Sequence, residues 1–128
     1  MENERAASIM IGNKEYELVL TTGATKQIAK RYGGLASLGD KLMKAENFEN
    51  ALDELIWLIA LLANQSILIH NFQHPEDKWD PLTEETIELL TSPHDLAAYK
   101  DAIMESMFRG TKQYVESEPE PEKNASAG

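Results

Sequence analysis

The 128-residue chain contains no cysteine, which excludes disulfide frameworks and thiolate metal sites. Positive charge is also scarce: 12 Lys and Arg residues stand against 22 Asp and Glu residues, and the formal net charge is −10. Such a chain does not bind nucleic acid by bulk attraction, because the phosphate backbone repels it. The sequence has neither a Gly-rich phosphate loop nor a nucleophile elbow. We therefore expect a protein that is not an enzyme and holds no metal or cofactor.

A secretory signal is lacking as well, because MENERAAS carries charges of both signs and no apolar core. We therefore expect the protein in the cytoplasm. Hydrophobic residues make up 42% and charged residues 27%, as in soluble globular domains. We predict a frayed N-terminus over residues 1–7, one domain over residues 8–115 and a disordered tail over residues 116–128. The tail, ESEPEPEKNASAG, is acidic and has no large apolar residue.

One stretch, Ala51 to Phe72, is far more apolar than the rest of the chain. Wound as a helix at about 100° per residue, it has no polar face, so it lies either in a protein core or in a membrane. Its uninterrupted apolar run, Leu55 to Ala63, is much shorter than the roughly 20 residues of a membrane span. We therefore predict no membrane and a core helix, capped by Asn47 and ended by His74-Pro75.

The segment before this helix predicts a β-hairpin with strands over residues 8–11 and 14–20, joined by a turn at Gly12-Asn13. A lone hairpin is marginal in water, so its apolar face must pack on a helix. That face consists of Ile9, Ile11, Tyr16, Leu18 and Leu20.

Local signals predict four further helices. Thr21-Thr22 offers an N-cap, with Thr22 preferred, for a helix that ends at Tyr32, before Gly33-Gly34. A short helix follows over residues 35–43. Thr83 is expected to cap a helix that turns Ile87, Leu89 and Leu90 inward.

The last helix is expected to start at Ser92-Pro93-His94-Asp95 and to end at Gly110. The predicted fold class is α+β, mostly helical. An N-terminal two-stranded β-hairpin packs on a bundle of about four to five helices around the long central apolar helix.

Two patterns suggest ligands and are weighed against simpler interpretations. His70 and His74 are four residues apart on a helix, but a zinc site needs a further placed ligand, and the proline after His74 is expected to spoil the shared face.

The stretch from Lys26 to Lys44 has five basic residues against one acid and resembles a helix-turn-helix. Its second helix lacks base-reading side chains. A small DNA-binding regulatory protein is therefore the alternative function.

The polar triplet Asn64-Gln65-Ser66 interrupts the apolar helix. It indicates either buried groups satisfied by the hairpin or the following loop, or a polar spot in an apolar docking groove. Methionines near the end of the last helix suit either adaptable binding or core filling. The candidate protein-binding residues are Gln65, Leu68, Ile69, Phe72, Met104, Met107 and Phe108.

Three runs resemble a known family: IGNKEYELVLTTGATKQIAKRYGGL, ENALDELIWLIALLANQSILIHN and LTEETIELLTSPHDLAAYKDAIMESMFRGTK. Together they resemble the tail assembly chaperones of long-tailed phages and prophages of Gram-positive bacteria, over about Ile9 to Lys112. The similarity extends over the whole domain and includes no catalytic signature.

The resemblance implies a chaperone that coats the tape measure protein in the host cell cytoplasm until tail-tube subunits polymerise around it. The protein is then absent from the finished virion. In such families a translational frameshift often adds a C-terminal extension that recruits the major tail (tube) protein. Residues 116–128 would then be the unshifted ending. Self-association through the hairpin edge or the central helix is left open.

Overall fold

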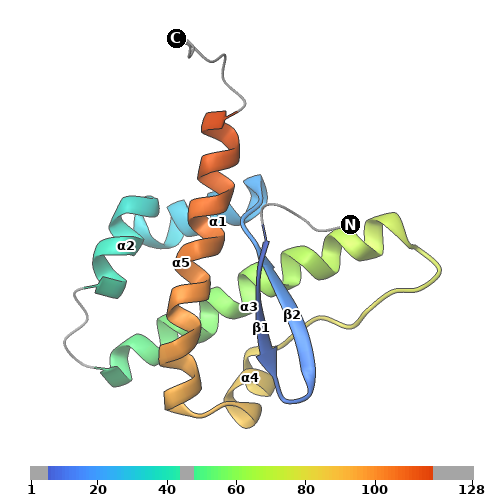
Figure 1. Ribbon diagram of the computed structural model, residues 1–128, viewed down its shortest axis with the longest axis horizontal. Coiled ribbons are helices and arrows are strands. Elements are labelled where there is room, and N and C mark those ends of the chain that lie inside the picture. Colours follow the sequence, from blue (N-terminus) through green and yellow to red (C-terminus); the bar gives the residue numbers. More distant parts are fainter. Residues whose placement is uncertain (1–5, 44–47, 117–128) are drawn as a thin grey trace.

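The computed structural model describes residues 6–43 and 48–116, which form a two-stranded hairpin and five helices (Figure 1). The fold is α+β and mostly helical, as the sequence predicts. The elements are β1 (Ala6–Ile11), β2 (Lys14–Val19), α1 (Thr22–Tyr32), α2 (Leu35–Met43), α3 (Phe48–Gln73), α4 (Glu84–Leu90) and α5 (Pro93–Glu116).

The hairpin pairs Ala6 with Val19 and Ile11 with Lys14, in an antiparallel register around the tight turn. Gly12 has a φ of 63°, which a hairpin turn of this length needs and which glycine adopts without strain. β1 begins at Ala6, inside the segment that was expected to be frayed. Val19 is buried together with its neighbour Leu18, so both faces of this end of β2 are covered, and α3 and α5 both contact the strand.

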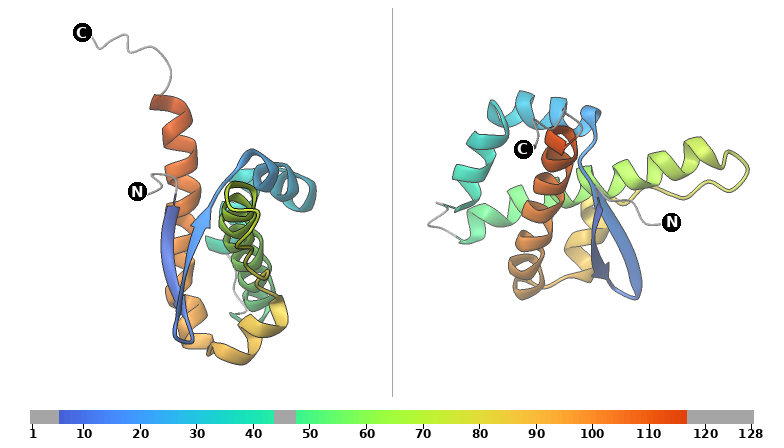
Figure 2. Two further views of the ribbon diagram at one scale, coloured as in Figure 1. Left: turned by 90° about the vertical axis from the view of Figure 1, so that its right-hand side faces the viewer. Right: turned by 45° about the horizontal axis from the view of Figure 1, so that its top comes forward.

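α3 is the central element, and its bounds agree with the prediction. It packs against β2, α4 and α5. The right-hand view of Figure 2 shows α5 in front and α3 behind the hairpin. Its N-terminal two thirds supply the centre of the core, with Leu55, Leu58, Ile59 and Leu62 almost fully buried. The remainder of the helix extends beyond the hairpin (Figure 1).

Local capping signals are mostly confirmed, with one correction. Thr21, not Thr22, caps α1: its backbone is extended and its hydroxyl oxygen accepts from the Ala24 N–H at 3.0 Å. At α5 the predicted capping box is present, because Ser92 Oγ accepts from the Asp95 N–H (3.2 Å) and the Asp95 carboxylate accepts from the Ser92 N–H (2.9 Å). Thr83 caps α4 as predicted.

Two helix predictions are wrong. Leu89 and Leu90 of α4 do not turn inward with Ile87 but are 76% and 54% exposed, because the short helix buries a single face. α5 continues past Gly110 to Glu116, since one glycine costs a helix only about 1 kcal/mol. The predicted cap Asn47 and the tail from residue 117 onward lie outside the described residues.

The apolar helix is longer than the uninterrupted run Leu55 to Ala63 indicates, and its length does not exclude a membrane span. Within the described residues, one helical segment, Ala51–Gln73, is long and apolar enough to cross a membrane, with a mean hydropathy of 1.6. The core helix of a soluble protein passes the same test, and this segment packs on the hairpin, α4 and α5. That the protein has no membrane partner stays a prediction.

Candidate functional site

The C-terminal end of α3 presents large apolar side chains to solvent. Leu68 is 60% exposed and Phe72 is 88% exposed, although both belong to the most apolar segment of the chain. They are four residues apart and therefore lie on one face of the helix. This face, defined by Leu68 and Phe72, is called the α3 end patch below. Ile69 next to it is half-buried.

The other predicted binding residues are placed elsewhere. Gln65 is half-buried and accepts a hydrogen bond from the Thr21 hydroxyl, which ties the start of α1 to α3. On α5, Met104 is packed against the core, Met107 is only 6% exposed, and Phe108 is 63% exposed. Met107 is therefore buried in this structure, and its part in a binding surface stays a prediction.

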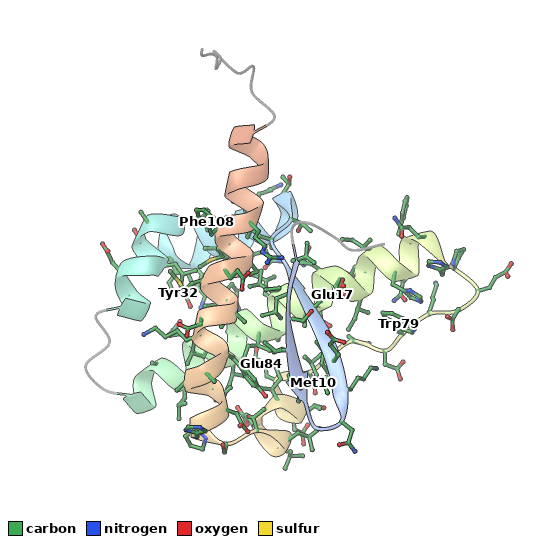
Figure 3. All side chains as sticks on the ribbon, viewed as in Figure 1. Met10, Glu17, Tyr32, Trp79, Glu84 and Phe108 are labelled. Carbon is green, nitrogen blue, oxygen red and sulfur yellow. The ribbon has the colours of Figure 1, made fainter. Side chains whose placement is uncertain are left out.

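Phe108 and the α3 end patch do not form one surface. Figure 3 shows Phe108 on the upper half of α5, with the hairpin between it and the projecting end of α3. The seven predicted residues thus divide into four on α3, of which Leu68 and Phe72 are exposed, and three on α5, of which Phe108 is exposed.

The loop over residues 74–83, called the returning loop below, follows α3 and runs back along the helix. Two asparagines of α3 hold it there. Asn64 Nδ2 donates to the Leu82 carbonyl oxygen (2.8 Å), and Asn64 Oδ1 accepts from the Leu82 N–H (2.7 Å). Asn71 binds the main chain of Trp79 in the same two-point way, at 3.1 and 2.8 Å. The interpretation of the polar triplet as satisfied groups is therefore confirmed for Asn64, whose partner lies in the following loop. Gln65 is also satisfied, but by the α1 cap Thr21 and not by the hairpin or the loop. The sequence did not predict the contact of Asn71, because its partner, Trp79, lies eight residues further along, in the loop.

His70 and His74 take part in an aromatic stack with Trp79. The His70 ring lies 3.5 Å from the Trp79 ring, centroid to centroid, at 9°, and 4.6 Å from the His74 ring at 19°. The two histidines do share a side of the helix end, contrary to the expectation. His70 Nε2 lies 2.7 Å from the Asp77 carbonyl oxygen. In the part of the chain that the structure describes, no three metal-ligating side chains come together.

A groove opens between β2 and the returning loop. Its volume is about 300 Å³, and it is lined by Lys14, Glu15, Tyr16 and Glu17 of β2, Ser66 and Ile67 of α3, and Trp79. Figure 3 shows Glu17 and Trp79 on either side of this space. Three segments distant in sequence build it, so no local pattern predicts it.

The basic stretch proposed for DNA binding is partly occupied by internal contacts. The Arg31 guanidinium lies 4.4 Å from the centre of the Trp57 ring and 3.5 Å from a Glu54 carboxylate oxygen. Tyr32 donates a hydrogen bond to Glu54, and burial together with this bond raises the pKa of Tyr32 to about 12. Lys41 Nζ lies 5.9 Å from the Tyr32 ring centroid. Lys44 lies outside the described residues. DNA binding stays a prediction.

Comparisons with protein-family models, curated proteins and solved structures found no match to this chain.

Proposed function

We propose that the protein is a non-enzymatic tail assembly chaperone of a long-tailed phage. It binds the tape measure protein in the host cell cytoplasm, keeps it soluble, helps tail-tube subunits polymerise around it and is absent from the finished virion. The observation that carries the proposal is the α3 end patch, where Leu68 and Phe72 are exposed at helical spacing. Such a face suits the apolar stripe of a client helix. The resemblance of the three sequence runs supports the same function.

The size of the α3 end patch favours weak, reversible binding. Burying a large apolar side chain contributes about 1.5–3 kcal/mol, so the two together supply roughly 3–6 kcal/mol before the costs of association. A dissociation constant of 1 μM needs about 8 kcal/mol. One copy therefore holds a client helix loosely, and stable coating of a long client needs many copies. Loose binding also allows the chaperone to leave when tube subunits arrive.

The net charge of −10 supports this role. Several acidic copies on one rod repel one another, which keeps the complex soluble and limits aggregation of the apolar client.

The test is co-expression with the tape measure protein of the same phage, with the soluble client fraction and co-purification as readouts. The double variant Leu68→Asp/Phe72→Asp should leave the client insoluble. The matched control Leu89→Asp changes a side chain that is 76% exposed on α4, and it should behave like the unchanged protein. Circular dichroism should show all of these proteins folded.

Two results would contradict the proposal. One is an unchanged protein that neither solubilises nor co-purifies with the client. The other is the presence of this chain in purified virions at the level of a structural subunit, measured by mass spectrometry. If Leu89→Asp instead of the double variant abolishes the complex, the α3 end patch is not the binding surface.

A further inference from the structure

β2 has an open outer edge. The sheet has two strands, so each strand has one edge that is not paired within it. The outer edge of β1 is covered by α5, and Tyr99 of α5 donates a hydrogen bond to the Met10 carbonyl oxygen. No other described segment forms a main-chain hydrogen bond with β2.

The register shows which groups of β2 face outward. The Met10 carbonyl points away from the hairpin, because it reaches Tyr99, so Met10 and its partner Glu15 form a non-hydrogen-bonded pair. The N–H and C=O groups of Glu15 therefore point away from β1. The N–H and C=O groups of Glu17, two residues further along β2, point away from β1 in the same way. β2 thus offers the main-chain groups of two residues to an added strand.

The groove described above runs beside this edge. Ser66 and Ile67 of α3 line it together with β2, and Trp79 lines it from the returning loop. The Trp79 wall is fixed, because Asn71 holds its main chain and the ring stacks on His70. Space for part of an added strand therefore exists before a partner arrives, which lowers the cost of binding.

The charge of the groove selects its occupant. Glu15 and Glu17 are both exposed and stand on the same face of the strand, roughly 7 Å apart. Neither forms an ion pair with the side chains that the structure describes, whereas the cation of Lys14 lies over the Tyr16 ring at 5.4 Å. A partner strand with Lys or Arg at alternate positions would place its charges against these two carboxylates.

The same charges disfavour the other occupants. Antiparallel pairing of β2 with β2 of a second copy, centred on Tyr16, would set Glu15 opposite Glu17, and directly opposed like charges destabilise a sheet. The segment over residues 117–128 carries three Glu against one Lys, so it is repelled in the same way.

We propose that the groove between β2 and Trp79 binds an extended, basic segment of a partner protein, which adds as a strand to the outer edge of β2. This surface is distinct from the α3 end patch, and the proposal does not depend on the chaperone function. The binding mode is strand addition, in which main-chain bonds supply affinity and the two glutamates supply selectivity.

The experiment uses the full chain and a synthetic peptide, Thr-Lys-Val-Arg-Val-Lys-Thr, in titrations at low salt followed by amide NMR. The amides of Glu15 and Glu17 should shift and become protected from hydrogen exchange. The same peptide with N-methyl groups on alternate amides keeps its charge but loses the bonding edge, and it should bind at least tenfold more weakly. A peptide with Glu in place of Lys and Arg should not bind.

Two charge-matched variants complete the test. Glu15→Gln/Glu17→Gln should weaken peptide binding roughly fivefold, as expected for two exposed charge pairs. Asp53→Asn/Asp101→Asn removes the same charge from exposed positions on α3 and α5 and should have little effect.

Four outcomes would overturn the proposal: no binding of the basic peptide, equal binding of the N-methylated peptide, equal weakening by both variants, or protection of the Glu15 and Glu17 amides by self-association alone. The N-methyl comparison uses the unchanged protein, so it decides the question even if a variant misfolds.

Discussion

Asn64 and Asn71 make the same two-point bond to the returning loop, but in different surroundings. Asn64 binds Leu82, which is 4% exposed, whereas Asn71 binds Trp79, which is 43% exposed. Asn64→Ala removes two hydrogen bonds, each worth about 1 kcal/mol, and leaves the Leu82 N–H and C=O groups with little access to water. We expect a loss of about 2–3 kcal/mol in the free energy of unfolding.

Asn71→Ala is the matched control, because water can replace its lost bonds. We expect a loss of no more than about 1 kcal/mol. Both variants are measured by urea unfolding, followed by circular dichroism. If Asn71→Ala costs as much as Asn64→Ala, burial of the main chain does not set the energy of these bonds. A loss below about 0.5 kcal/mol for Asn64→Ala would equally refute the reasoning.

Two further predictions concern pH and backbone conformation. The pKa of Tyr32 is raised to about 12 in the folded protein, above its ordinary value, so its contribution to stability is complete below about pH 10 and is lost as pH rises through 12. Tyr32→Phe should therefore lose less stability than the unchanged protein between about pH 10 and 12 in urea titrations, and parallel curves would contradict this. Gly33 ends α1 with a φ of 92°, so Gly33→Ala should lower the free energy of unfolding by about 1 kcal/mol or more. Gly23→Ala, inside the same helix with ordinary packing space, should raise it by about 0.5–1 kcal/mol, and thermal melts with the opposite order would refute both expectations.

Features that depend on neighbours in sequence were predictable. The capping box at Ser92 and the glycine stop at Gly33 are made within a few residues, so their signals are local. The bounds of α3 followed from its apolar run and from the proline after His74. The hairpin turn at Gly12 followed from its dipeptide.

Features that depend on tertiary packing were not predictable. Met107 and Phe108 are adjacent, yet one is buried and the other exposed, because each step along a helix turns the side chain by about 100° and packing decides which side faces inward. For the same reason Leu89 and Leu90, which were predicted to face inward, are exposed. The groove beside β2 needs three separate segments, and Trp79 in a polar loop gave no sign of its place there.

The hydrogen bond from Tyr99 to Met10 joins residues 89 positions apart, and it marks the contact of the first strand with the last helix. The hairpin therefore lacks part of its cover until nearly the whole domain has been synthesised. At about 5–20 residues per second, translation from Met10 to Tyr99 takes roughly 4–18 s. During that interval Ile9 and Ile11 of β1 have left the ribosome, but α5, which packs on β1, has not yet been completed. The domain thus completes its core late in translation, and a chain truncated before α5 should be a substrate for cellular proteases.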